Sequence, residues 1–519
     1  MKKIIKSILL ISLLFLLAGC SENNSSSDAQ VSSKDSMPRL SITTVKQGKD
    51  ALDFATKPVA LYVSKQVATW TPNYQIPPEP YYEECTITVT DASGAETLSA
   101  VPANVKVRGN WTTNYDKKPL RIKFADKQNL LGLNDGAKMK NWVLTAEYKD
   151  ASMLRNKTAL SIAREILGKD GLYVADACFV EVEINGQYWG VYLLTEQQQI
   201  NQNRIDITEA EKDYTGTDIG YFLEFDGYYI NEDPLQGFFV DYAGNASLLP
   251  FNGDENSGIK VSCLSNGFNK SHSNVGITIK SDIYSQEQHD FIASYVNNVY
   301  QILYNAAYKD KAYVFNAEYT EIVASLELTP KEAVEKVINI NSLADMYIIS
   351  ELTCDADIYW SSFFMDVDFG PEGDKKLTFE APWDFDSAMG NKDRCADGTG
   401  FWAANIVPDV NNAYYTINPW LAVLMHEDYF QDIIRDKWTA AYDSGVFKRA
   451  YKAIDQDTKA YKDAFNRNYE KWNNIENNQS FVHELSAQAA LCKTQGDAAK
   501  FLSEWLETRV EFLNDYWHK

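Results

Sequence analysis

Two aspartates separated by one residue, Asp384 and Asp386, lie in the stretch FEAPWDFDSAMGN at 379–391. On an extended backbone, side chains at positions i and i+2 point to the same side. Two carboxylates on one side form either a solvated strand edge or a pair of oxygen donors for one cation, and Mg²⁺ prefers such hard oxygen ligands. The same pair could also cap the turn that follows, so the surrounding sequence has to decide between these interpretations.

A third acid, Asp357, stands 27 residues before Asp384, and Ser362 follows Asp357 by five residues. In protein kinases, a catalytic aspartate in a loop is followed five residues later by a metal-binding asparagine, and a hairpin then leads to a metal-binding aspartate. The spacing therefore indicates phosphoryl transfer, which needs one carboxylate near the attacking hydroxyl and others for a cation. Taken alone, Asp357 could also be an ordinary helix N-cap.

The kinase tripeptide D-F-G occurs literally at Asp368-Phe369-Gly370. It stands only 11 residues after Asp357, which is too close for an intervening hairpin. Turn-forming residues follow it at 371–374, so we predict that it forms the tip of a hairpin rather than a metal site.

The elements that must position these acids are strands in the first part of the chain and helices in the second. Expected strands and hairpins cover 85–90, 105–110, 119–124, 179–196 around an Asn-Gly turn, 220–229 and 362–382. Expected helices cover 150–167, 286–326, 329–352 and most of 419–519. This order predicts an α+β fold with a β-rich N-terminal part and a helix-rich C-terminal part.

The composition is that of a folded globular protein, with 45% hydrophobic residues among 519 and a net charge of −23. This charge argues against nucleic acid as a partner, because phosphate backbones require an excess of Lys and Arg. Six cysteines follow Cys20 without any C-x-x-C pair, which argues against a structural zinc site and leaves both disulfides and free thiols open.

The first twenty residues are expected to be a targeting segment. Three lysines precede an apolar run at 8–17, which is too short for a comfortable membrane anchor. The ending Leu-Ala-Gly-Cys at 17–20 resembles a bacterial lipobox, which implies lipidation of Cys20 and attachment to the membrane at the cell envelope, outside the cytoplasm. The polar stretch at 21–37 is expected to be a flexible tether.

Five ordered blocks resemble the spore coat protein H (CotH) kinase family: RGNWT at 108–112, KKPLRIKF at 117–124, NWVLTAEYKDASMLRN at 141–156, INGQYWGVYLLTEQ at 184–197 and APWDFDSAMGN at 381–391. The resemblance covers roughly residues 100 to 440. It implies an atypical protein-kinase-like fold that binds ATP with Mg²⁺ or Mn²⁺ and phosphorylates Ser or Thr on extracellular or envelope proteins.

The resemblance also implies roles for individual residues. Asp357 matches the catalytic aspartate, Asp384 matches the metal-binding aspartate, and Asp386 is the second acid of the same motif. Ser362 stands where ordinary kinases have a metal-binding asparagine, which puts a second metal in doubt. No Gly-rich G-x-G-x-x-G loop is present, so phosphate has to be held in another way.

The cations and aromatic residues of the expected nucleotide site have competing interpretations. Lys123 or Lys118 would contact phosphates, and the strand alternation favours Lys123, because Phe124 then faces the core; Lys118 could instead be a solvated charge at a strand end. Glu196 would pair with that lysine or reach a metal. Arg108 and Arg155 are further cations, although a structural ion pair explains Arg108 better than direct contact with the nucleotide. Trp360 and Trp383 flank the acids, where they could belong to the core or stack on adenine.

The sequence analysis thus divides the chain into a signal peptide at 1–20, a tether at 21–37, a β-rich segment at 38–100, a kinase-like domain at 101–440 and a helical extension at 441–519. The favoured function is a surface-anchored kinase. The alternative is a catalytically inactive scaffold or adhesin on the same fold, binding protein or polysaccharide, since fold does not fix function.

Overall fold

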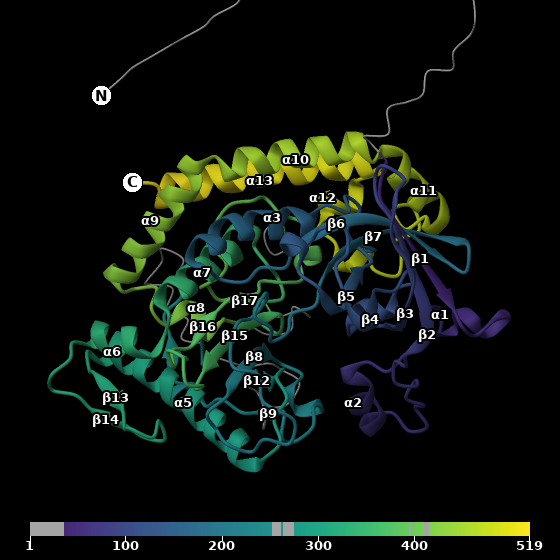
Figure 1. Cartoon of the computed structure of the whole chain (residues 1–519). Helices are drawn as coiled ribbons and strands as arrows, with labels where there is room; N and C mark the ends of the chain where they lie inside the picture. The colour runs from purple at the N-terminus through teal and green to yellow at the C-terminus, as the bar shows by residue number, and fades with distance from the viewer. Residues whose placement is uncertain (1–35, 252–260, 263–274, 394–395, 409–414) are drawn as a thin grey trace, which may run out of the picture.

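The computed structural model describes residues 36–251, 261–262, 275–393, 396–408 and 415–519 (Figure 1). The expected signal peptide, Cys20 and nearly all of the expected tether lie outside the described residues. Within the described part of the chain, no helix has both the length and the apolar character that crossing a membrane requires.

Seven strands of the first part of the chain form a closed barrel (Figure 1). Their order around the barrel is β1-β2-β3-β4-β5-β7-β6, and β1 closes it by pairing in parallel with β6. The interior is filled by alternating apolar side chains, as period-two patterning requires. The strands are β1 (Arg39–Thr44), β2 (Glu83–Thr90), β3 (Glu96–Val107), β4 (Leu120–Gln128), β5 (Met139–Thr145), β6 (Ala177–Ile184) and β7 (Gln187–Glu196).

A second, five-stranded sheet has the order β16-β15-β8-β12-β9. Its strands are β8 (Gly220–Asp226), β9 (Gly237–Phe238), β12 (Gly276–Ile279), β15 (Phe363–Asp368) and β16 (Thr378–Phe379). Three two-stranded pieces accompany it: β10 (Ser247–Leu248) with β11 (Val261–Ser262), β13 (Tyr313–Phe315) with β14 (Ile322–Ala324), and β17 (Val407–Pro408) with β18 (Tyr415–Thr416).

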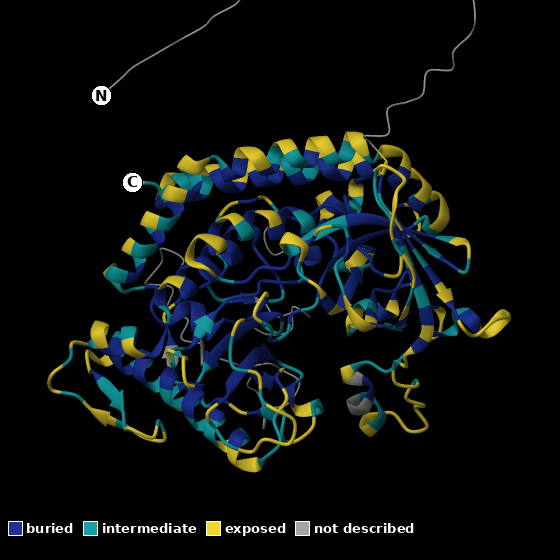
Figure 2. Cartoon of the chain, viewed as in Figure 1, coloured by how far each residue is buried: buried dark blue, intermediate teal, exposed yellow. Residues whose placement is uncertain are grey.

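Helices cover the second sheet and one side of the barrel. In Figure 1, α10 and α13 run side by side across the top of the molecule, and Figure 2 shows their buried faces turned toward the body. The helices are α1 (Asp53–Thr56), α2 (Tyr62–Trp70), α3 (Arg155–Leu167), α4 (Tyr242–Asn245), α5 (Gln286–Lys309), α6 (Pro330–Val337), α7 (Ile340–Thr353), α8 (Pro419–Ala422), α9 (Asp428–Ser444), α10 (Val446–Ala460), α11 (Lys462–Trp472), α12 (Ala487–Leu491) and α13 (Gln495–Trp517).

The mixed α and β content agrees with the predicted fold class, and several predicted elements are confirmed. The hairpin around the Asn-Gly turn is β6–β7, and both turn residues have positive φ. The D-F-G tripeptide begins at Asp368, the last residue of β15, and continues into the turn of the β15–β16 hairpin, where the Asp368 carboxylate accepts a hydrogen bond from the Gly370 amide. It therefore belongs to a turn, as predicted.

Three predicted helices have different limits in the structure. The helix expected from residue 150 begins at Arg155, because the Asp150 carboxylate accepts hydrogen bonds from the amides of Ser152 and Arg155 in a preceding turn. The helix expected over 286–326 ends at Lys309, and the β13–β14 hairpin follows. The helix expected over 329–352 is divided into α6 and α7.

The structure also joins segments that the sequence analysis separated. The barrel crosses the boundary expected at residue 100, since β1, β2 and the first residues of β3 are part of it. In the C-terminal segment, α10 packs on α3 and α11 packs on β7.

Candidate functional site

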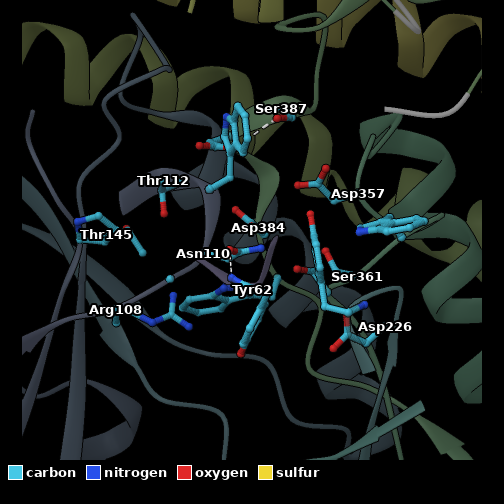
Figure 3. A pocket seen from close by; sticks show the side chains of 18 of the residues that line it. Tyr62, Arg108, Asn110, Thr112, Thr145, Asp226, Asp357, Ser361, Asp384 and Ser387 are labelled. Carbon is cyan, nitrogen blue, oxygen red and sulfur yellow. Dashed lines mark hydrogen bonds between the residues drawn. The ribbon is translucent and has the colours of Figure 1, made fainter. Parts of the chain in front are cut away.

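A cavity of about 940 Å³ lies where the barrel faces the second sheet. This volume is at the upper end of the range for small-molecule sites. The barrel side contributes the turn after β3 and the segment after β5, and the other side contributes the end of β8, the loop after α7 and the segment after β16. Figure 3 shows Arg108, Thr112, Asp357 and Asp384 around this space.

Asp357, Asp384 and Asp386 meet in this cavity. One carboxylate oxygen of each lies within 4.8 Å of those of the other two, and within the described part of the chain these are the acids that could hold a metal ion together. Asp386 is buried, whereas the other two are partly accessible from the cavity. The spacing of 27 residues, read from the sequence, thus corresponds to a real juxtaposition.

Local backbone structure explains why the three acids converge. Asp357 lies in the loop after α7, where its amide donates a hydrogen bond of 3.0 Å to the carboxylate of Asp355. Asp384 has left-handed backbone angles, φ 71° and ψ 56°, and it precedes a short 3₁₀ turn that contains Asp386. The two acids of the P-W-D-x-D segment are therefore brought together by a turn, not by the extended backbone that their i, i+2 spacing suggested.

The acids repel one another in this buried position. Burial, followed by the charges of Asp386 and Asp357, raises the pKa of Asp384 well above its ordinary value. Burial also raises the pKa of Asp386, although the ammonium group of Lys149 opposes this effect. Lys149 alone therefore does not offset the effects that raise the pKa values of Asp384 and Asp386.

Lys149 is the cation closest to this cluster, and the sequence analysis did not select it. Its Nζ lies 3.3 Å from Asp386 and 3.7 Å from Glu484, and it donates a hydrogen bond to the Ser387 hydroxyl. Burial lowers the pKa of Lys149, but Asp386, Tyr115, Asp357 and Glu484 outweigh it, and the pKa lies well above the ordinary value. The acids around Lys149 thus favour its charged form, and Lys149 lines the cavity.

Glu484 reaches the cavity from the C-terminal segment that was expected to be an extension. Its carboxylate also accepts hydrogen bonds from the indole of Trp111 at 3.1 Å and from the hydroxyl of Tyr115 at 2.8 Å. No local sequence signal marks Glu484, because it lies more than three hundred residues from Lys149 along the chain. Lys149 had a weak signal, since it stands in a block that matched the resembled family.

Arg108 lies in the cavity on the barrel side. Its guanidinium stacks over the ring of Trp383, 5.4 Å from the centroid, and Arg108 forms no ion pair with any described residue. The structural ion pair weighed for Arg108 is therefore not found. An arginine held on an aromatic face keeps its N–H groups available for an anion.

Four other sequence predictions require correction. Lys123 is exposed on β4 and lies away from the cavity lining, because Phe124 does face the core, as predicted, and alternation then turns Lys123 outward. Lys118 is neither near the cavity acids nor solvated: it is buried and donates to the carbonyls of Thr113 and Tyr115.

Glu196 and Arg155 also have structural partners. Glu196 is fully buried, and its carboxylate accepts from Arg204 at 3.0 Å and from the side chain of Asn134 at 2.9 Å, so it reaches neither a phosphate-binding lysine nor the acid cluster. Arg155 pairs with Asp150 in the interior and donates from Nε to the carbonyl of Ala388.

Ser362 and Trp360 both line the cavity near Asp357. The Ser362 amide donates to the carboxylate of Glu224 at 2.9 Å. Trp360 packs flat against Gly227, where a Cβ would come within 2.3 Å of the indole, and it meets the ring of Tyr228 edge-on at 5.5 Å. The structure therefore brings Arg108, Trp360, Ser362 and Trp383 together with the acids.

The donor set fits a divalent cation. Three carboxylates face one lysine, which leaves two negative charges when all four groups are ionised. Oxygen-only ligands of this kind suit Mg²⁺ or Mn²⁺. A cation held among these carboxylates would offset the mutual repulsion that, after burial, raises the pKa values of Asp384 and Asp386.

In a comparison with protein-family models, the model of the CotH kinase protein matches residues 105–513. The matched region contains the acid cluster, Lys149, Arg108 and Glu484, and it continues through most of α13. A search of curated proteins returned no match.

Proposed function

Because the chain belongs to the CotH kinase protein family, we propose that it is an atypical kinase. It transfers the γ-phosphate of ATP to Ser or Thr hydroxyls of extracellular or cell-envelope proteins, with Mg²⁺ or Mn²⁺. The observation that carries the proposal is the convergence of Asp357, Asp384 and Asp386 around one buried lysine in a large cavity. Phosphoryl transfer needs chiefly positioning and charge stabilisation, and these groups supply both.

The three carboxylates have distinct roles in this proposal. Asp384 and Asp386 hold the divalent cation, which, when bound, neutralises charge on the phosphate oxygens. Asp357 lies in the loop after α7, where Asp355 holds its amide, and its carboxylate orients the acceptor hydroxyl and accepts the proton as the oxygen–phosphorus bond forms. At the same time the bond between the γ-phosphorus and the oxygen that bridges it to the β-phosphate breaks, and ADP departs as the leaving group.

Two cations take the place of the lysines expected from the sequence. Lys149 is rigidly held between Asp386 and Glu484, so its ammonium is positioned to contact phosphate oxygens without reorganisation. Arg108, also on the barrel side of the cavity, offers a fork of N–H donors. Together they offer a physical substitute for the missing Gly-rich loop.

The proposal extends to fold and location. A β-rich part and a helix-rich part with the reactive acids facing the cavity between them support a kinase-like fold. The N-terminal sequence with Cys20 supports a lipid anchor in a bacterial cell envelope. The variant Cys20→Ser should be released from the membrane fraction, and cell fractionation measures this. If the variant stays in the membrane fraction, the lipid anchor is contradicted, whereas the kinase proposal is unaffected.

Calorimetry of ATP binding to residues 36–519, with and without Mg²⁺, tests the kinase proposal. We expect binding that requires the cation and is lost in Asp384→Ala. The matched control is Asp432→Ala, an exposed aspartate on α9 that pairs with Arg435; this variant should bind ATP like the unaltered protein. If the folded protein binds no ATP with either Mg²⁺ or Mn²⁺, the kinase proposal fails and a non-catalytic scaffold becomes the better account.

A further inference from the structure

The backbone of Asp384 is in a conformation that an L-residue adopts only at a cost. With φ 71° and ψ 56°, it lies in the left-handed region, where Cβ crowds the following carbonyl group. Such a residue persists only when its surroundings hold it, and this happens most often at functional sites. A contact next to Asp384 should therefore stabilise this turn.

That contact comes from the second residue of α3. The amide of Phe385, directly after Asp384, donates a hydrogen bond of 2.7 Å to Oδ1 of Asn156. Asn156 is 7% exposed and borders the cavity. It projects from the first turn of a thirteen-residue helix, which is a rigid support.

The side chain of Asn156 is itself oriented by an acid. Its Nδ2 donates to both carboxylate oxygens of Glu147, at 3.1 Å and 3.0 Å, which leaves Oδ1 facing the amide of Phe385. Glu147 is 4% exposed and is fixed in turn by the hydroxyl of Thr145 at 2.6 Å. A chain of hydrogen bonds thus runs from the end of β5 through Glu147 and Asn156 to the turn that contains the acids.

The neighbouring residue on α3 holds the other end of the same turn. Nε of Arg155 donates to the carbonyls of Ala388 at 3.1 Å and Met389 at 3.3 Å. Two adjacent residues of one helix therefore bind the backbone on both sides of Asp386, and Asn156 is the one that touches the residue next to Asp384.

We propose that Asn156, oriented by Glu147, is a positioning residue that holds Asp384 in its left-handed conformation and so keeps its carboxylate against those of Asp357 and Asp386. The effect on cation binding rests on the proposed function, whereas the effect on the backbone does not. Asn156 acts through Phe385 and touches none of the reacting groups.

The experiment compares Asn156→Leu with the unaltered residues 36–519 by two measurements. Hydrogen–deuterium exchange followed by mass spectrometry reports the amide of Phe385, and we expect exchange in a peptide spanning 383–387 to be about tenfold faster in the variant. Mn²⁺ binding followed by electron paramagnetic resonance should show a dissociation constant about tenfold higher. The matched control is Asn305→Leu, which removes a similarly buried amide from α5 and should change neither measurement.

The outcomes separate this inference from the proposed function. Unchanged exchange at 383–387 would overturn the positioning role, and so would faster exchange with an unchanged Mn²⁺ affinity. If the unaltered protein binds no Mn²⁺, the proposed function fails, and the exchange measurement still decides whether Asn156 holds the turn. If circular dichroism shows that Asn156→Leu is unfolded, Glu147→Gln is used instead. This variant keeps one acceptor for Asn156, and we expect exchange at 383–387 to increase about threefold.

Discussion

Two buried lysines, Lys117 in the barrel and Lys149 in the cavity, show how neighbouring carboxylates change the effect of burial on a lysine pKa. Lys117 is 1% exposed and donates only to backbone carbonyls, those of Ala146 and Val191, beneath the ring of Tyr192. Lys149 is 7% exposed and lies against two carboxylates. Burial lowers the pKa of Lys117 to about 7, whereas the pKa of Lys149 lies well above its ordinary value.

The comparison teaches that the charge of a buried lysine depends on what faces it. Glu147 raises the pKa of Lys117 only in part, because burial dominates there. In the cavity, several negative groups act on Lys149 together. A lysine that remains charged at every physiological pH can bind phosphate, whereas one that titrates near neutrality cannot do so dependably. The predictions below are ordered from the largest expected effect to the smallest.

Replacing each lysine by methionine should separate function from structure. We expect Lys149→Met to lower kcat/KM for ATP by about 100-fold, because a preorganised charge on the phosphates is removed. Lys117→Met should stay within about threefold of the unaltered enzyme, since Lys117 lies outside the cavity lining. Steady-state kinetics with Mg²⁺ and ATP measure both. Equal losses in the two variants would contradict the assignment of Lys149.

Removing one of the two partners of Lys149 should have an intermediate effect. In Glu484→Gln, Asp386 is the one carboxylate that remains beside the ammonium group, and we expect the dissociation constant for ATP with Mg²⁺ to rise about tenfold. Calorimetry measures it. The matched control is Glu504→Gln, an exposed acid on α13 that pairs with Lys500. An unaltered affinity in Glu484→Gln would show that Asp386 suffices to orient Lys149.

The stability of the barrel should depend on pH through Lys117. Its pKa falls from 10.5 in the unfolded chain to about 7 in the folded protein, so burying the charge costs most below pH 7, and this cost disappears as the pH rises toward 10.5. Relative to the unaltered protein, Lys117→Met should therefore be most favourable below pH 7 and lose at least about 1 kcal/mol of that advantage by pH 10. Denaturant unfolding at several pH values measures this, and a difference independent of pH would refute the lowered pKa.

The smallest effect concerns the aromatic support of Arg108. Trp383→Leu removes the face over which the guanidinium lies, and we expect ATP affinity to fall about threefold, as the loss of a cation–π contact of about 0.5–1 kcal/mol implies. Trp383→Phe keeps an aromatic face and should lose less. Calorimetry of the two variants side by side makes the comparison, and identical losses would mean that the ring matters only for packing.

Much of the fold was predictable, because its signals are local. The Asn-Gly turn, the alternation that buries Phe124 and the D-F-G turn all follow from residues adjacent in the chain. The start of α3 was placed too early, because Asp150 resembles an N-cap but accepts hydrogen bonds within a turn that precedes the helix. Closure of the barrel could not be predicted, since pairing between β1 and β6 is a long-range contact.

The acids of the site could be predicted from their spacing in the sequence. The residues whose positions depend on tertiary packing could not. Asp357, Asp384 and Asp386 were found from their order and separation. Lys123 was preferred because strand alternation predicts which side chains point away from the core. Alternation does not predict which of these outward-facing side chains border a cavity, and Lys123 does not. Glu484 completes the surroundings of Lys149 only through the docking of the last helices, which no local pattern encodes.

Closure of the barrel by β1 has a consequence for how the protein can be shortened. The family match begins at residue 105, inside β3, so a fragment of residues 105–513 lacks β1, β2 and most of β3. Strand β6 would then lose its neighbour β1, β4 would keep only the residues of β3 from 105 to 107, and both would expose unpaired amides and carbonyls. Bare strand edges recruit other chains, so such a fragment would be prone to aggregation. A fragment that keeps the barrel closed must therefore include β1 and β2, and it is longer than the segment that matches the family model.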